Sequence, residues 1–302
     1  MFAIEAQNIT KVYENGFLAL NNINLSIEKG RVCGLLGPNG AGKSTFINII
    51  SGAIKKTSGK LKILNMDNDK YTQDIKLKLG VVPQEIVNEP IFTVYEVLDF
   101  FSGMYGVRKN DRKKRINEVL EALNLADKKN VRARTLSGGM KRRLMVAKAL
   151  IHNPEIVILD EPTAGVDVEL RQNIWNYVRD LNKKGITIIF TTHYLEEAEK
   201  LCEKIAIINK GKLITYDSTE KLKFLFGETI INAKVKNDDF VIDKKNNNDI
   251  IEFNNKNVKI VTKTGNESYY IQELAIKGYI ENINIEHPSL EDIFVKLVNN
   301  DK

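Results

Sequence analysis

A glycine-rich segment near residue 40 places the strongest constraint on how this chain can fold. It matches the pattern G-x-x-x-x-G-K-[ST]. We predict that nine of its residues bind nucleotide: Gly37, Pro38, Asn39, Gly40, Ala41, Gly42, Lys43, Ser44 and Thr45. The apolar run 31–36 before the segment suits a buried parallel strand, and the run 46–50 after it suits a packed helix. This context predicts an α/β protein with a phosphate-binding loop.

The residues of this loop have separate predicted roles. Gly37, Gly40 and Gly42 allow backbone N–H groups to surround the phosphates. Lys43 is expected to reach the β- and γ-phosphates as a catalytic group, and Ser44 to offer its hydroxyl to Mg²⁺. Because the loop contains no carboxylate for this ion, a later strand is expected to supply one.

The composition fits a globular protein with one substantial core. The chain has 302 residues, of which 43% are hydrophobic. Its longest apolar runs, such as 156–159 and 186–190, are strand-sized and far shorter than the ~20 residues of a membrane-spanning helix. The first residues read as a strand rather than a secretory signal, so we expect a cytosolic chain. The two cysteines, Cys33 in a strand and Cys202 in a helix, are predicted to be buried bystanders.

The net charge of +6 raises the question of a nucleic-acid partner. Lysine and arginine are spread along the chain, and no basic tract interleaved with aromatic residues is present. The charge therefore favours a solvated surface, which anionic lipid headgroups could approach. No nucleic-acid partner is expected.

Polar residues stand at the ends of two predicted strands farther along the chain. The run 156–159 ends in Asp160 and Glu161, and the strand 186–192 ends at His193. Because parallel strands deliver their carboxyl ends to one edge of a sheet, we expect these side chains near the phosphate loop. Asp160 is then the carboxylate for magnesium. Glu161 would polarise the attacking water, and His193 would contact the γ-phosphate, although a lone histidine is usually structural.

Tyr13 and Gln84 carry weaker signals. Tyr13 lies in a loop between predicted strands 4–12 and 23–27, where it can either stack on an adenine ring or belong to the core. Gln84 ends the short strand 80–83, where an amide can ligate Mg²⁺ or orient water, or simply belong to the surface. The residues alone leave both alternatives open.

A helical insertion follows. Apolar residues recur at helical spacing over 94–105 and 109–124. Ser137, followed by Gly138 and Gly139, is predicted to cap the next amphipathic helix. Its free N–H groups would give the chain a second anion-binding surface.

The phosphate loop, the glutamine, the serine–glycine segment, the acidic strand end and the histidine follow one another in an order that resembles the ATP-binding subunit of an ABC transporter. The resemblance covers residues 3–218. It implies ATP and Mg²⁺ as cofactors, with Tyr13 stacking on adenine. Gln84 would face magnesium and a transmembrane partner. Ser137 to Gly139 would be the signature that closes on ATP bound by the opposite subunit.

The same resemblance implies roles for the acidic strand end and the histidine. Asp160 would be the second residue of the magnesium site. Glu161 would be the catalytic base, and His193 the γ-phosphate switch. Two departures from the family pattern are present: Met140 stands where most members have Gln, and Ala164 to Asp167 replace the commoner Ser-Ala-Leu-Asp.

These departures point to one branch of the family. Segments 136–143, 161–167 and 191–198 together resemble ABC-2-type export ATPases, particularly the YadG-like ones. The segment 288–294 is also similar to the tail of that branch. This resemblance implies export rather than import.

The implied fold is α/β, with a P-loop NTPase core of ABC type at 1–218. That core would contain a mixed sheet with flanking helices, an antiparallel β subdomain and a helical subdomain at about 85–150. Residues 219–302 are predicted to form a small α+β appendage. In it, Asp217 and Glu220 are expected to cap a short helix that ends at Gly227, and the last helix covers 290–298. The appendage shows no catalytic constellation.

The resemblance implies two kinds of partner. One is a second ATP-binding subunit, identical or paralogous, and the other is an ABC-2-type transmembrane permease. Contact with the cytoplasmic face of the (inner) membrane would pass through that permease. A second class stays open, namely a soluble ABC ATPase that acts on ribosomes or nucleic acid. The chain has one cassette and neither a zinc module nor a long coiled coil, which favours the first class. In this family the membrane subunit selects the transported substrate, so the present sequence does not identify it.

Overall fold

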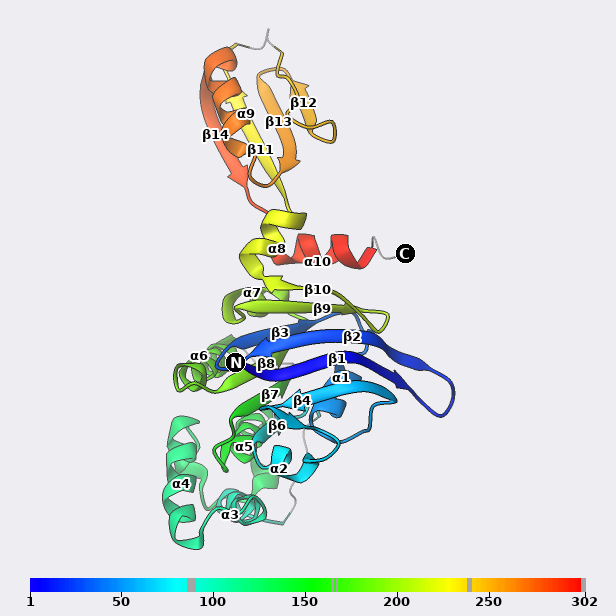
Figure 1. The fold of residues 1–302 in the computed structure, drawn as a ribbon. Coiled ribbons are helices and arrows are strands. Elements are labelled where there is room, and N and C mark those ends of the chain that lie inside the picture. Colours follow the sequence, from blue (N-terminus) through cyan, green and yellow to red (C-terminus); the bar gives the residue numbers. More distant parts are fainter. Residues whose placement is uncertain (86–90, 164–165, 167, 238–240, 300–302) are drawn as a thin grey trace. The chain divides into compact units, whose positions relative to one another are not determined.

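The computed structural model describes the chain except residues 86–90, 164–165, 167, 238–240 and 300–302, and it gives no side-chain environment for 168–170. The chain divides into two compact units, Met1–Tyr216 and Asp217–Lys302 (Figure 1). The division falls next to the boundary that the sequence predicts after residue 218. No helix among the described residues combines the length and the apolar character needed to cross a membrane.

A six-stranded sheet forms the centre of the first unit. Its strands, in spatial order, are β10 (Lys212–Ser218), β9 (Lys204–Asn209), β3 (Val32–Leu36), β8 (Thr187–Thr191), β7 (Ile156–Asp160) and β6 (Leu79–Val82). The pairs from β9 to β6 are all parallel. Strands β3 and β8 are buried along their whole length, as expected for parallel strands covered on both faces. The carboxyl ends of β3, β6, β7 and β8 therefore share one edge.

A second, antiparallel sheet packs into the same core. Its order is β2 (Leu18–Glu28), β1 (Phe2–Val12), β4 (Ser58–Ile63) and β5 (Met66–Asp67). Apolar residues of this sheet, including Ile4 and Ile23, join Phe46 and Ile49 of α1 (Lys43–Ile50) in one buried cluster. Strand β2 starts at Leu18, before the predicted start at Ile23, and its first half includes the buried Leu20 beside the exposed Asn22.

Three helices of the first unit fall where the sequence predicts them: α3 (Val94–Met104), α4 (Lys109–Ala122) and α5 (Gly138–Leu150). The unit also contains α2 (Thr72–Lys76), α6 (Val168–Lys183) and α7 (Leu195–Leu201), with short 3₁₀ turns at Ala126–Lys128 and Ala133–Thr135. Thr93 and Glu96 form a reciprocal capping box at the start of α3. Arg115 of α4 donates to the carbonyl oxygens of Leu150 (2.7 Å) and Ile151 (3.2 Å), which ties the end of α5 to the helical insertion.

The predicted position of one cysteine is wrong. Cys202 follows α7 with extended backbone angles, because that helix ends at Leu201. Cys33 and Cys202 are both buried and free, which confirms that they are bystanders of the core. Burial raises the pKa of Cys33 to about 12, so its thiol is inert at neutral pH.

The second unit is an antiparallel sheet with helices. Its strands, in spatial order, are β12 (Ile250–Asn254), β13 (Asn257–Lys263), β11 (Glu228–Val235) and β14 (Ile280–Glu286). Its helices are α8 (Thr219–Phe226), α9 (Glu267–Glu273), which continues as a π-turn over Leu274–Gly278, and α10 (Leu290–Asn299). Tyr270 of α9 is fully buried on the sheet and donates to Asp249 (2.5 Å).

The predicted cap of α8 is wrong. Ser218 is the capping residue, and its hydroxyl accepts from the backbone N–H of Lys221 (3.3 Å). Asp217 stands one residue too early, and it accepts from the N–H of Ser218 instead. The helix does end before Gly227, where an added Cβ would lie 2.3 Å from the carbonyl oxygen of Lys223. Close packing, not a left-handed backbone, requires glycine there.

His152 gives the first unit a testable pH dependence. It follows α5, donates from Nε2 to the carbonyl oxygen of Leu79 (3.0 Å) and stacks on Tyr105 with ring centroids 3.9 Å apart. Burial lowers the pKa of His152 to about 4, against about 6.5 in an unfolded chain. Between these values the unfolded chain binds a proton that the folded chain does not, so stability falls as the pH falls from 6.5 to 4.

We expect this group to reduce the free energy of unfolding by about 2 kcal/mol between pH 7 and pH 4.5. Urea unfolding of the wild type and of His152→Gln across this range measures the effect. The variant should show a shallower dependence on pH. Equal slopes in the two proteins would show that His152 is not the titrating group.

Candidate active site

The phosphate loop joins β3 to α1, and its glycines are needed for local reasons. Gly42 is the N-cap of α1 with a left-handed φ of 108°, and an added Cβ would lie 2.7 Å from the carbonyl oxygen of Ala19. At Gly37 an added Cβ would lie 2.2 Å from the carbonyl oxygen of Ile208. Gly40 has φ 78° with open space around it. The backbone therefore curls tightly and directs N–H groups toward the start of α1.

Lys43 and Ser44 are the first two residues of α1. The ammonium of Lys43 donates to the carbonyl oxygens of Gly37 (2.7 Å) and Pro38 (3.0 Å), so it lies over the loop. Burial lowers the pKa of Lys43, while the charges of Glu161 and Asp160 act in the opposite direction. The Lys43 ammonium therefore interacts electrostatically with the carboxylates of Glu161 and Asp160. Ser44 is exposed at the same helix end.

Asp160 and Thr191 face each other across β7 and β8. Their Cα atoms are register partners, and the Thr191 hydroxyl donates to Asp160 Oδ1 (2.6 Å). The same hydroxyl accepts from the backbone N–H of Glu161 (2.9 Å). Thr191 therefore fixes the Asp160 carboxylate at the edge that the phosphate loop occupies. The sequence-based predictions do not include this threonine, although it stands near the end of a predicted strand.

Glu161 lies at the centre of a polar group. Its Oε2 accepts from the side-chain amide of Gln84 (2.9 Å) and lies 3.4 Å from Nδ1 of His193. The Glu161 side chain is 14% exposed and that of His193 is 51% exposed. Three strand ends, those of β6, β7 and β8, thus bring these residues together as the sequence predicts for one sheet edge.

The loop that carries His193 is held by a buried glutamate. Glu197 of α7 is 1% exposed and accepts from the hydroxyls of Thr163 (2.7 Å) and Thr192 (2.7 Å). Arg171 lies 3.4 Å from its other oxygen. The segments after β7 and after β8 are joined by this carboxylate, which the sequence analysis did not identify. The predicted turn at 164–167 rests on residues 164, 165 and 167, which lie outside the described residues.

Tyr13 lies beside the phosphate loop. Its hydroxyl is 3.3 Å from the hydroxyl of Thr45, and its ring is stacked with Phe17 at a centroid distance of 6.5 Å. The residue is 36% exposed, which rules out the alternative of a core tyrosine. Lys11 approaches the ring as a cation, with Nζ 5.0 Å from the centroid. An exposed aromatic surface therefore adjoins the loop.

Ser137 caps α5 as predicted. Its hydroxyl accepts from the backbone N–H of Met140 (3.3 Å), and Gly138 and Gly139 form the first turn. Ser137 and Gly138 are exposed, while Leu136 before them is buried. The Ser137 hydroxyl satisfies the N–H of Met140, whereas the N–H groups of the first turn at Gly138 and Gly139 have no acceptor within the helix.

The residues at this edge suit Mg²⁺. The candidate ligands are the hydroxyl of Ser44, the carboxylate of Asp160 and the amide oxygen of Gln84, and magnesium prefers such oxygen ligands. Gln84 directs its amide nitrogen to Glu161. This leaves the amide oxygen for a cation. Groups of three or more acidic, histidine or cysteine side chains that could hold a metal are absent from the described residues.

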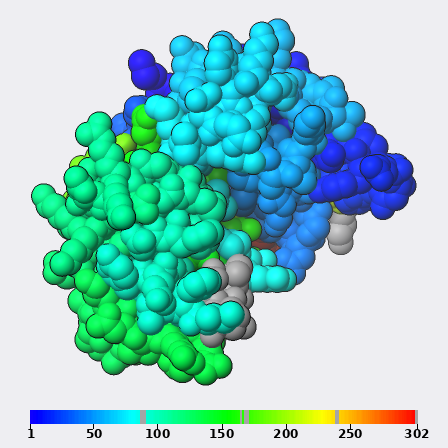
Figure 2. All heavy atoms as spheres, turned by 90° about the horizontal axis from the view of Figure 1, so that it is seen from below, coloured from blue at the N-terminus to red at the C-terminus, as the bar shows by residue number. Residues whose placement is uncertain are grey.

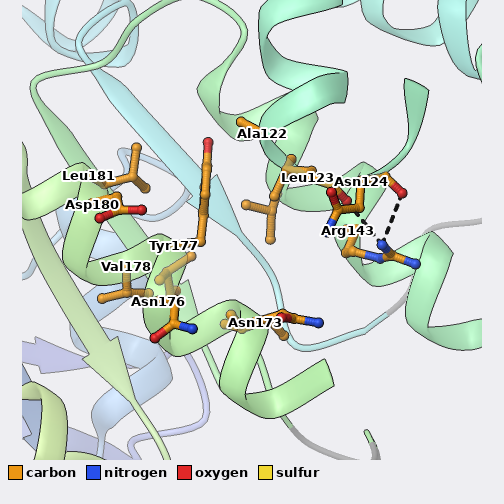
Figure 3. A pocket seen from close by; sticks show the side chains of 13 residues that line it. Ala122, Leu123, Asn124, Arg143, Asn173, Asn176, Tyr177, Val178, Asp180 and Leu181 are labelled. Atoms are coloured by element: carbon orange, nitrogen blue, oxygen red, sulfur yellow. Dashed lines mark hydrogen bonds between the residues drawn. The ribbon is translucent and has the colours of Figure 1, made fainter. Parts of the chain in front are cut away.

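A separate cavity of about 170 Å³ lies away from this edge, among α4, α5 and α6 (Figure 3). Its walls include Leu123 after α4, Val146 of α5 and Tyr177 of α6, and Figure 3 labels Leu123 and Tyr177 among the side chains that line it. Burial raises the pKa of Tyr177 to about 12. None of the predicted nucleotide residues lines this cavity. This cavity is therefore separate from the candidate active site at the edge of the sheet.

Comparison with known proteins gives a consistent result. Residues 20–164 match the family model described as ABC transporter. The linearmycin resistance ATP-binding protein LnrL of Bacillus subtilis is 37% identical, and the alignment covers 97% of both chains. Nod factor export ATP-binding protein I of Cupriavidus metallidurans is 36% identical over 72% of both chains.

Solved structures agree with the fold. A structure described as an ATP-binding subunit of an ABC transporter has a TM-score of 0.69 at 24% identity and covers 74% of this chain and 93% of its own. The ATP-binding cassette MJ0796, a dimer in a post-hydrolysis state with ADP and Pi, has a TM-score of 0.66 at 31% identity. It covers 71% of this chain and 98% of its own. The chain therefore belongs to the ABC transporter ATP-binding proteins and is an ABC-type ATPase.

Proposed function

We propose that this chain is the ATP-hydrolysing subunit of an ABC-2-type export complex and works with a separate membrane subunit. The observation that carries the catalytic part is the placement of Glu161 between Gln84 and His193, on the edge that also carries Asp160. The export part is supported by LnrL, which is named for resistance to linearmycin and matches this chain over nearly its whole length. The chain would then lie at the cytoplasmic face of the membrane.

In this mechanism the phosphate loop and Lys43 bind the phosphates of ATP, and Tyr13 stacks on the adenine. Mg²⁺ would be held by Ser44, Asp160 and Gln84, and it would neutralise charge on the β- and γ-phosphates.

Glu161 acts as the base. Both of its neighbours contact Oε2, so Oε1 is the atom placed to accept a proton from the attacking water. His193, half exposed beside it, can donate to the γ-phosphate. Thr191 keeps Asp160 oriented while this occurs.

The signature at Ser137 to Gly139 serves a second subunit. The N–H groups at the start of α5 suit the γ-phosphate of ATP bound to an opposite chain, because a helix N-terminus favours anions. The dimeric MJ0796 cassette with ADP and Pi supports this assembly. A homodimer or a heterodimer with a paralogous subunit satisfies the geometry equally.

A groove on the surface of the first unit supports the proposal of a membrane partner. A cavity of about 350 Å³ is lined by Ser51, Gln73, Lys76, Leu77, Leu79, Val81, Met104 and Tyr105. Leu77 is 49% exposed and Met104 61% exposed, so apolar surface lies open between α2 and the end of α3. In Figure 2 the cyan segment that holds α2 and the teal-green helical segment form two lobes with a hollow between them. We assign this groove to a cytoplasmic helix of the permease.

The test is membrane retention. The tagged chain is expressed in its native host, and membranes are separated from the soluble fraction. We expect the wild type in the membrane fraction and the Leu77→Asp/Met104→Asp variant in the soluble fraction, because two charges in the groove block an apolar helix. Ile276→Asp, at a comparably exposed apolar residue, is the control and should stay with the membrane.

Basal ATP hydrolysis by the groove variant should equal that of the wild type, which separates docking from catalysis. Wild-type protein that sediments with ribosomes and not with membranes would contradict the export proposal. That outcome would favour a soluble ABC ATPase instead.

A further inference from the structure

Arg142 makes the densest set of contacts at the candidate site, although no role is assigned to it above. It lies on α5, just over one turn after Ser137, and is 3% exposed. Its guanidinium uses all five of its N–H groups. The acceptors are the carbonyl oxygens of Pro162 (2.9 Å from Nε), Pro83 (2.8 Å from Nη1), Gln84 (2.9 Å from Nη1), Asp160 (3.1 Å from Nη2) and Glu161 (from Nη2).

These acceptors belong to two neighbouring strand ends. Val82 of β6 and Leu159 of β7 are parallel register partners, and the five carbonyls follow directly after them. One side chain of α5 thus joins the segment that carries Gln84 to the segment that carries Glu161. All of its hydrogen bonds go to backbone carbonyl oxygens. They therefore fix the positions of the two backbone segments that follow β6 and β7.

Glu161 needs such support. Its φ is 47°, in the left-handed region that a side chain other than glycine rarely adopts. Strained backbone of this kind persists where its surroundings determine it. Arg142 binds the carbonyls before, at and after this residue. The N–H of Glu161 is held in addition by the Thr191 hydroxyl (2.9 Å).

We infer that Arg142 is a positioning residue that sets the geometry of Glu161 and Gln84 according to the position of α5. This inference rests on the proposed function, because it gives Glu161 the role of base. The helix that Arg142 occupies begins with the signature at Ser137. A displacement of the signature relative to the sheet therefore moves the guanidinium, and with it the backbone of the base.

Only arginine satisfies this arrangement. A lysine has three N–H groups at one point and cannot reach five carbonyls on two segments. A glutamine has two N–H groups and a shorter side chain, and its own carbonyl would face the backbone carbonyls. Burial lowers the pKa of Arg142, while the charges of Asp160 and Glu161 raise it, so the two carboxylates favour the charged form.

The test separates positioning from simple stability. The full chain with Arg142→Gln or Arg142→Lys should bind ATP with Mg²⁺ within about twofold of the wild-type affinity, while single-turnover hydrolysis falls at least about tenfold. Arg142→Lys, which keeps charge and most of the volume, serves if Arg142→Gln does not fold. Arg115→Gln is the matched control. It removes an arginine that binds carbonyls at the other end of α5, and its rate should stay within about twofold of the wild type.

A double-mutant cycle completes the experiment. In a Glu161→Gln background, Arg142→Gln should cause no further loss of rate, because Arg142 acts through that residue. Additive losses, or wild-type turnover in both Arg142 variants, would overturn the inference while leaving the proposed function intact. Normal turnover by Glu161→Gln alone would instead contradict the proposed function, and the role of Arg142 would fall with it.

Discussion

Glu161→Gln should retain ATP binding and lose at least about 100-fold in the rate of hydrolysis. The amide has nearly the shape of the carboxylate but cannot accept a proton from water. The phosphate loop, Lys43 and the oxygen ligands for magnesium are unchanged by the substitution. Pre-steady-state phosphate release under single-turnover conditions measures the chemical step, and equilibrium binding of a fluorescent ATP analogue measures affinity.

The structure shows how the Glu161→Gln variant can keep its local contacts, and Lys43→Ala provides the contrasting variant. Gln84 donates to Glu161 Oε2, and the amide oxygen of a glutamine at position 161 can accept the same hydrogen bond. A loss of rate therefore reports on proton transfer more than on collapse of the site. Lys43→Ala should show the opposite pattern, with affinity lost first, because the ammonium lies over the phosphate loop. Wild-type turnover by Glu161→Gln would remove Glu161 from the role of base.

Much of the candidate site follows from local sequence. The phosphate loop is contiguous and flanked by an apolar strand and helix, so its conformation is decided within twenty residues or so. Asp160, Glu161 and His193 end apolar runs, and parallel strands place such ends together. The structure brings Glu161 into contact with Gln84 and His193, as that rule predicts. Their roles in binding and catalysis stay predictions.

The remaining features depend on packing that no local pattern encodes. Arg142 reads as one more basic residue on an amphipathic helix, because its five acceptors come from segments distant in sequence. Glu197 reads as a surface residue of α7, yet it is buried between two hydroxyls. The cap of α8 moved from Asp217 to Ser218, since a shift of one residue separates a capping position from a flanking one. The contacts of Arg142 and Glu197 join distant elements, and the N-cap of α8 is an element boundary. Contacts and boundaries of these kinds depend on the whole fold.

In the proposed mechanism every hydrolysis site lies between two chains, with the loop of one facing the signature of the other. Ser137→Arg should bind ATP through its own loop but deny the partner's γ-phosphate its contact. Lys43→Ala should have an intact signature and a defective loop. Each variant alone should be nearly inactive, since both sites of each homodimer carry one lesion.

Mixing these two variants tests whether each site is shared between two chains. In a mixed dimer the intact loop of Ser137→Arg faces the intact signature of Lys43→Ala, so one site carries no lesion. An equal mixture contains half mixed dimers with one good site in two, which predicts about a quarter of the wild-type single-turnover phosphate release per chain. The account predicts this recovery above either variant alone. A Ser137→Arg protein that forms the ATP-dependent dimer and hydrolyses ATP at the wild-type rate would contradict it.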